Sequence, residues 1–151
     1  MRYWLMKSEA DCYSIDDLHR DKTTLWTEVR NYQARNFMMD METGDRVLFY
    51  HSNGGDQTGV VGEALVSKTA IPDPSQFNKS SEYYDAKSTN EKPRWYCVEI
   101  KFKKKFKQPL YLKSIKSDKV LQHMIVAQKG SRLSITPVDK AHFEKILTVT
   151  T

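Results

Sequence analysis

The alternation of apolar and polar residues is cleanest between residues 95 and 106, and it constrains the fold more than any other stretch of this chain. Successive side chains of a strand point to opposite faces of the sheet, so residues of one parity share a face. The sequence therefore predicts a half-buried strand with a basic outer face. The apolar parity consists of Tyr96, Val98, Ile100, Phe102 and Phe106, and the other parity consists of Trp95, Cys97, Glu99, Lys101, Lys103 and Lys105.

Further strands and helices are expected on both sides of this segment. Apolar composition predicts strands at 2–6, 46–52, 58–68 and 133–135. Capping residues and helical spacing predict helices at 15–20 after Ser14, 31–40 with Asn31 as N-cap, 118–127, and from Thr136-Pro137 onward. Lys7, Ser8 and Glu9 end the first strand with sudden polarity, and we expect their side chains to lie at a rim. The irregular segment 70–94 predicts a long ordered loop of the kind that often carries function, and the alternative is a flexible excursion without a role.

Short strands with helices between them favour an α+β fold built on a small mixed barrel. The length of 151 residues and ordinary apolar and charged fractions predict a single domain over residues 1–151. No apolar run is long enough to cross a membrane and no signal peptide is recognisable, so we expect a cytoplasmic protein. Cys12 and Cys97 lack the spacing of a metal or redox motif and suit reduced thiols. A net charge of +5 favours an anionic partner.

The stretch from Trp26 to Asn36 is the strongest candidate for a binding site. Trp26 and Tyr32 offer flat apolar faces, and the polar residues between and after them offer forks and amides that match nucleobase edges. Such side chains are costly in a core, because each buried polar group without a partner costs about 1–3 kcal/mol. The alternative is that Asn31 only caps a helix and the arginines are solvated. The polar residues are Arg30, Asn31, Gln33, Arg35 and Asn36.

Several motifs, in order and over nearly the whole chain, resemble the EVE domain family. They are Y-W-L-M-K-S-E (3 to 9), W-T-E-V-R-N-Y-Q-A-R-N (26 to 36), G-D-R-V-L-F-Y-H-S-N (44 to 53), G-V-V-G-E-A (59 to 64), P-R-W (93 to 95) and R-L-S-I-T-P-V (132 to 138). The resemblance implies a PUA-like open β-barrel of about five to six strands flanked by short helices, related to the YTH readers of methylated adenine. It also implies a pocket for a modified nucleobase at Trp26. Two residues depart from the family pattern: Ala10 replaces a proline, and Glu28 replaces a glycine close to the pocket.

Together these observations predict that a flipped base stacks on Trp26, against a second wall from Trp95, Tyr32 or Tyr84. The predicted base-binding residues are Ser8, Trp26, Arg30, Asn31, Tyr32, Gln33, Tyr50, His51, Ser52 and Trp95, and Lys7, Arg30 and Arg35 are predicted to take phosphate or the exposed edge. The expected partner is DNA or RNA that carries a modified base, bound by a monomer. The lysine-rich run 101–107 is interpreted first as a solvated strand edge.

The alternative class is an enzyme, a hydrolase or transferase, that acts on modified nucleotides or nucleic acid. His51 and Ser52 would lie beside the pocket, and Cys12 and Cys97 are possible nucleophiles. Adjacent residues on a strand point apart, so His51 and Ser52 cannot easily act together. No nucleophile motif, phosphate-binding loop or metal-ligand spacing is present, and we predict no catalytic residue, no metal and no cofactor. A pure protein-interaction module would leave the amides between Asn31 and Asn36 unexplained.

Overall fold

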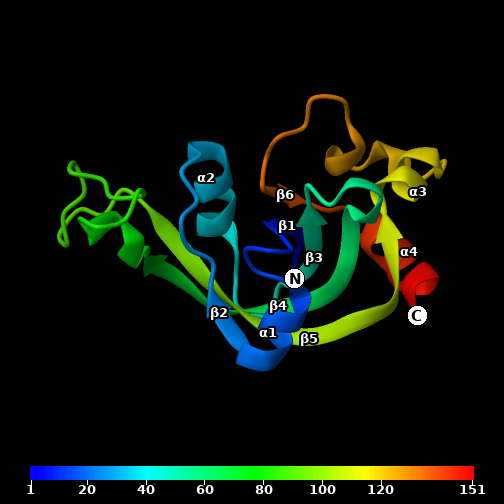
Figure 1. Ribbon diagram of the computed structural model, residues 1–151, viewed down its shortest axis with the longest axis horizontal. Coiled ribbons are helices and arrows are strands. Elements are labelled where there is room, and N and C mark those ends of the chain that lie inside the picture. Colours follow the sequence, from blue (N-terminus) through cyan, green and yellow to red (C-terminus); the bar gives the residue numbers. More distant parts are fainter.

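The computed structural model describes residues 1–151 and contains a six-stranded sheet in the order β2-β5-β4-β3-β1-β6 (Figure 1). β1 and β3 run parallel, every other pair is antiparallel, and the sheet is open because the edge strands β2 and β6 do not pair. The strands are β1 (Tyr3–Glu9), β2 (Thr23–Leu25), β3 (Arg46–Ser52), β4 (Gly59–Pro72), β5 (Tyr96–Tyr111) and β6 (Ile135–Pro137); the helices are α1 (Ile15–Asp21), α2 (Tyr32–Asp40), α3 (Leu112–Ser117) and α4 (Lys140–Thr150). The predicted α+β class, an open barrel of about five to six strands flanked by short helices, is confirmed, and its six strands form one open sheet.

Two apolar clusters cover the two faces of the sheet. Alternating residues of β1 enter different clusters, with Trp4 and Met6 in the first and Leu5 in the second. α1 and α2 contribute to the first cluster, whereas α3 and α4 contribute to the second. None of the helices is long and apolar enough to span a membrane.

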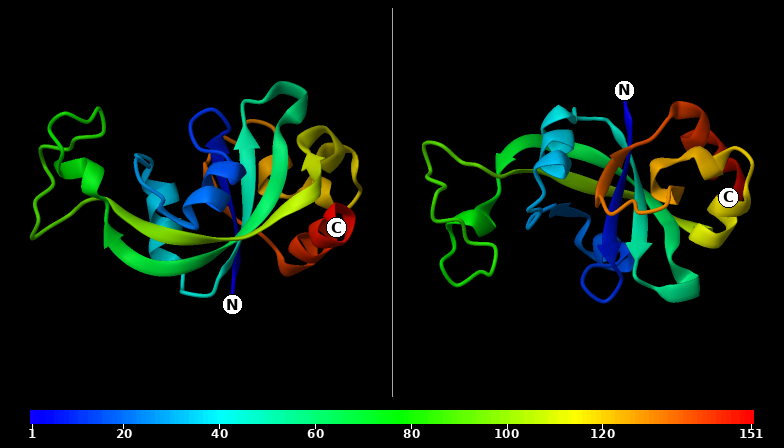
Figure 2. Two further views of the ribbon diagram at one scale, coloured as in Figure 1. Left: turned by 60° about the horizontal axis from the view of Figure 1, so that its bottom comes forward. Right: turned by 90° about the horizontal axis from the view of Figure 1, so that it is seen from above.

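β4 and β5 form a long curved ribbon that connects the two ends of the molecule (Figure 2). One end carries the segment between the two strands, and the other end carries α3 and α4. The glycines of β4 allow this ribbon to approach its neighbours closely. A Cβ atom at Gly62 would lie 2.6 Å from the backbone oxygen of Lys104 and 2.7 Å from a side-chain carbon of Ile15.

Both helix caps predicted from the sequence are confirmed. The side chain of Ser14 accepts from Asp17 N, and Asp17 in turn accepts from Ser14 N, which completes a capping box for α1. Asn31 Oδ1 accepts from Ala34 N at the start of α2. Local side-chain chemistry therefore fixes where the two helices next to the candidate site begin.

One other helix prediction was wrong, and another placed the start of its helix too early. Residues 118–127 form two short 3₁₀ turns, because the Asp118 carboxylate accepts from Val120 N and Leu121 N and Met124 adopts an extended conformation. α3 precedes this segment instead. The last helix begins at Lys140, since Thr136 and Pro137 pair with β1 as the edge strand β6.

Strand boundaries also differ from the prediction. β1 continues through Lys7 and Ser8 to Glu9 because the whole segment pairs in parallel with β3. β4 and β5 both run further than predicted, and the short strand β2 was not predicted. Cys97 was placed on the outer face of β5 but is buried with Val98 in the first cluster. The irregular register between β4 and β5 at Lys68–Ile71 breaks the simple alternation there. The predicted loop 70–94 begins later than expected, because β4 continues to Pro72 and Pro74–Phe77 form a 3₁₀ turn. Residues 78–95 contain neither helix nor strand.

Candidate functional site

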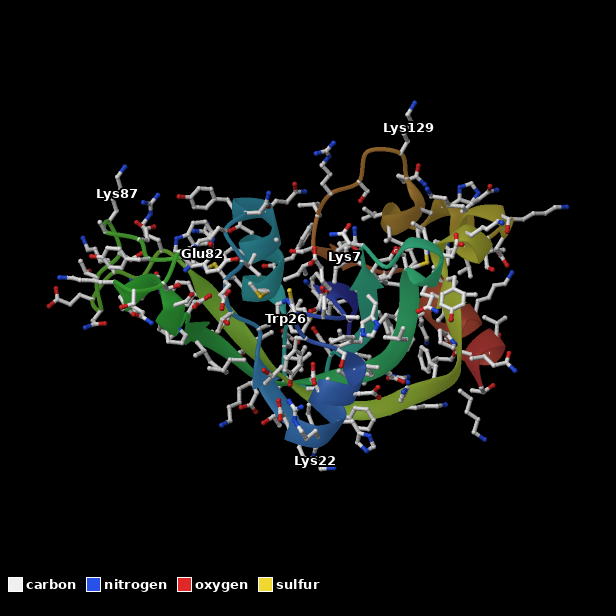
Figure 3. The ribbon with its side chains drawn as sticks, viewed as in Figure 1. Lys7, Lys22, Trp26, Glu82, Lys87 and Lys129 are labelled. Atoms are coloured by element: carbon white, nitrogen blue, oxygen red, sulfur yellow. The ribbon has the colours of Figure 1, made fainter.

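A pocket of about 550 Å³ lies between the segment 24–31 and the end of β1. Figure 3 shows Trp26 and Lys7 at the centre of the molecule, next to α2 and the ends of β1 and β3. Trp26 is 8% exposed and meets Phe49 edge to face, with the ring centres 5.6 Å apart. Its backbone N donates to Val98 O at 2.8 Å. The ring is therefore held by the core while it contributes to the lining of the pocket.

Five of the predicted site residues line this pocket: Lys7, Ser8, Trp26, Arg30 and Asn31. Burial lowers the pKa of Lys7 because it disfavours the charged ammonium, and an anionic ligand next to it would oppose that shift. Asn31 uses its side-chain oxygen as the N-cap of α2, so its amide nitrogen is still free to donate into the pocket. Capping and recognition are therefore compatible at Asn31. Residues that the sequence did not single out complete the wall: Cys12, Tyr13, Thr24, Leu25, Thr27, Val29 and Ser134.

Glu28 lies on the rim of the pocket with its backbone in the left-handed region, at φ 72°. Its N–H donates to the buried carboxylate of Asp73 at 2.7 Å, which holds the turn in place. A residue with a Cβ is strained at such a φ, whereas glycine is not. This strain gives a physical reason for the glycine that the family pattern favours here.

We expect Glu28→Gly to raise the free energy of unfolding by roughly 0.5–1 kcal/mol, because relief of the strain outweighs the added freedom of the unfolded chain. Glu28→Ala is the matched control, since it removes the carboxylate and keeps the strain. Denaturant unfolding of the two variants and the wild type measures the difference. Equal stability of Glu28→Gly and Glu28→Ala would contradict a strained backbone.

Arg30 was predicted to bind a base or a phosphate, but its guanidinium is occupied by the chain itself. It donates to Tyr83 O from both Nε and Nη2, at 3.1 and 2.7 Å, and to Ser75 Oγ at 3.0 Å. It also donates to Val29 O and forms an ion pair with Asp73. Arg30 thus connects the rim of the pocket to the loop after β4. Asp73 in this loop holds both Arg30 and the turn at Glu28, and the sequence did not predict this role.

Tyr32 and Trp95 do not provide the expected second wall of the pocket. Their rings stack on each other outside it, with centres 4.8 Å apart. The guanidinium of Arg35 covers Tyr32 at 4.8 Å and that of Arg30 covers Trp95 at 5.0 Å, so these aromatic faces are occupied. Trp95 Nε1 also donates to Asp85 at 2.9 Å. This stack fastens the loop 78–95 to α2.

The remaining predicted residues lie apart from the pocket. Arg35 donates to Arg94 O, and Gln33 is exposed on α2. Tyr50 and Ser52 line a second hollow of about 600 Å³, which shares Lys7 with the first. The structure therefore distributes most of the predicted set over the pocket, the stack of Tyr32 and Trp95, and the second hollow, whereas Gln33 and His51 lie in none of them.

His51 is a structural partner of α1. Its Nε2 accepts from Ile15 N at 3.1 Å, and burial lowers its pKa. The neutral ring is thus the form that the fold uses, with its acceptor nitrogen engaged. It lines neither the pocket nor the second hollow.

This contact predicts that the protein loses stability in mild acid. A His with a folded-state pKa below 6.5 contributes stability that is fully present above pH 6.5 and is lost as the pH falls through the folded-state value. We expect the melting temperature of the wild type to fall more between pH 7 and pH 5 than that of His51→Gln, whose amide oxygen can accept from Ile15 N without titrating. Parallel pH profiles of the two proteins would exclude this role.

Neither cysteine is prepared for nucleophilic chemistry. Desolvation and the nearby carboxylates of Glu9 and Asp11 raise the pKa of the Cys12 thiol, and burial raises the pKa of Cys97 to about 12. Both effects disfavour the reactive thiolate. Glu9, Asp11 and Cys12 form an exposed cluster of possible metal ligands, but Glu9 already accepts from Asn53 Nδ2 and from Cys12 Sγ.

Comparison with known proteins gives consistent matches along the whole chain. The model of the family described as EVE domain matches residues 2–149. Human thymocyte nuclear protein 1 is 35% identical over 97% of this chain and 73% of that protein. A crystal structure of a Pseudomonas syringae protein is 44% identical, with a TM-score of 0.92 and 99% of both chains covered. A crystal structure of human THYN1 protein, in complex with DNA containing 5-methylcytosine, is 34% identical with a TM-score of 0.91, over 99% of this chain and 98% of that one.

Proposed function

The chain belongs to the EVE domain family, and from that premise we propose that it binds a modified base of a nucleic acid in the pocket around Trp26 and leaves the base chemically unchanged. The observation that carries the proposal is the tryptophan itself, which is fixed by the core yet forms part of the wall of a pocket with polar groups around it. The human relative whose structure contains 5-methylcytosine DNA supports this class of partner.

The chemistry of the pocket suits a base with an added methyl group. A base that stacks on an indole gains about 1–3 kcal/mol, whatever its hydrogen-bonding pattern. The apolar residues Leu25 and Val29 line the same space, and a methyl group buried against such carbons gains roughly 0.8 kcal/mol. Ser8 and the free amide of Asn31 can then hydrogen-bond the polar edge of the base.

The state of the possible catalytic groups supports binding of the base without a chemical reaction. His51 already accepts a backbone hydrogen bond, and both thiols have raised pKa values. Nucleophilic catalysis requires an activated nucleophile next to an oriented base. We therefore propose a binding protein, acting as a cytoplasmic monomer, on either DNA or RNA.

The test is a titration of the protein against DNA and RNA oligonucleotides that contain either cytosine or 5-methylcytosine at a single position. We expect tighter binding of the modified oligonucleotide, by the few-fold factor that one buried methyl group supplies. After prolonged incubation, mass spectrometry should return every oligonucleotide unchanged. Equal affinity for all modified and unmodified bases in a wider panel would refute base reading, and recovery of a demodified or cleaved product would establish an enzyme.

A further inference from the structure

The second hollow has no role in the proposed recognition of the base, although it adjoins the pocket. Lys7 lines both spaces, and its Nζ lies 5.7 Å from the centre of the Tyr50 ring at the floor of the second. We infer that this second hollow binds the phosphodiester backbone beside the recognised base, an inference that rests on the proposed function.

Charge is the first argument for an anionic occupant. The lining contains three lysines, Lys7, Lys116 and Lys129, and no Asp or Glu. None of the three forms an ion pair, whereas Lys103 and Lys105 on the basic face of β5 pair with Glu63 and Asp16. The positive charge of this hollow is therefore not compensated by acidic side chains, although the chain contains 19 of them. Such a concave basic surface concentrates phosphate groups.

The three lysines differ in how firmly they are placed. Lys7 is half-buried on β1 at the boundary between the two spaces. Lys116 is exposed on the short helix α3. Lys129 lies on the loop after the 3₁₀ turns, and its side chain extends outward into solvent (Figure 3), so it acts at the outer rim. A backbone that passes from the pocket across Lys7 enters the hollow that Lys116 also lines.

Hydrogen-bonding groups provide a second, independent argument. Ser131 Oγ, in the wall of the hollow, is the one buried side-chain polar atom of the protein without a partner. A buried hydroxyl without a hydrogen-bond partner is unfavourable, because it has lost its bonds to water. Rotation of this side chain toward a phosphate oxygen would satisfy it.

The same lining is poorly suited to a second base. Its only aromatic residue, Tyr50, is 2% exposed, and burial raises its pKa to about 12, so it presents neither an open face nor an ionised hydroxyl. Stacking needs an accessible ring. The hollow therefore suits a compact anion. Because it meets the pocket at Lys7, we expect it to bind a phosphate that is attached to the bound nucleoside more tightly than a free phosphate.

The experiment compares wild type, Lys116→Ala and the control Lys101→Ala, which removes an exposed lysine on the outer face of β5. Each protein is titrated with 5-methyldeoxycytidine, with its 3′- and 5′-monophosphates, with a 5-methylcytosine oligonucleotide and with inorganic phosphate. We expect Lys116→Ala to bind the nucleoside normally. It should bind the oligonucleotide roughly three- to tenfold more weakly, with a salt slope smaller by about one. Lys101→Ala should behave as wild type.

Several outcomes would overturn the inference. An unchanged oligonucleotide affinity and salt slope in Lys116→Ala would remove the hollow from the binding path. Equal losses for nucleoside and oligonucleotide would make Lys116 part of base recognition or of folding. Inorganic phosphate that binds as tightly as either monophosphate would indicate a free-anion site. If wild type binds the nucleoside well but Lys116→Ala matches it with every ligand, only this inference fails; if wild type binds no ligand of the panel, the proposed function fails as well.

Discussion

Trp26→Leu is expected to reduce affinity for the modified base at least tenfold while the protein remains folded. Leucine fills much of the same apolar space but has no flat π face, so the loss reports on stacking, which is worth about 1–3 kcal/mol per base. Trp26→Ala should lose the same affinity and also about 3–5 kcal/mol of stability, because the ring is 8% exposed and packs edge to face on Phe49. Titration with the modified oligonucleotide and denaturant unfolding separate the two effects.

Met38→Ala is the matched control, since Met38 lies in the same apolar cluster and does not line the pocket. It should be destabilised by about 2–5 kcal/mol and should bind with wild-type affinity under conditions in which it is folded. Wild-type affinity in Trp26→Leu would show that the indole serves only the core and that the base binds elsewhere.

Arg30→Ala is expected to destabilise the protein by about 3 kcal/mol, because it leaves the Asp73 carboxylate buried without its ionic partner. The side chain of Asp73 is 1% exposed and that of Arg30 is 20% exposed, so solvent screens the pair weakly. Arg30→Lys should recover only part of the loss, since an ammonium cannot reproduce the fork that reaches Tyr83 O and Ser75 Oγ together. Denaturant unfolding gives the free energies, and limited proteolysis within residues 78–94 reports release of the loop.

Arg20→Ala is the control for the loss of an arginine, because Arg20 forms only exposed ion pairs with Asp17 and Asp21. Its stability should change by less than about 1 kcal/mol. A different result for Arg30→Ala would contradict this structural role. If the variant kept its stability but bound the oligonucleotide more weakly, with a salt slope smaller by about one, Arg30 would be the phosphate ligand that the sequence suggested.

The fold features that could be predicted from the sequence are those encoded by neighbouring residues. Ser14 and Asn31 cap α1 and α2 through bonds to residues three positions away, so a short window contains the whole signal. Alternation places Val47 and Phe49 in one cluster and Leu48 and Tyr50 in the other. At residues 118–127, local spacing favoured a helix, but capping by Asp118 and an extended Met124 produced 3₁₀ turns.

The candidate site also contains residues that could be predicted from the sequence and contacts that could not. The sequence by itself placed Trp26 in a binding segment and located the polar groups of Ser8 and Asn31, and these residues do line one pocket. The partner of each remaining side chain was decided only by tertiary structure. Arg30 meets Tyr83 across 53 positions, and His51 meets Ile15 across 36. A guanidinium offers the same N–H donors to a phosphate and to a backbone carbonyl, and an imidazole can donate to a phosphate or accept from a backbone N–H. Only the tertiary structure therefore determines which partner each of them contacts.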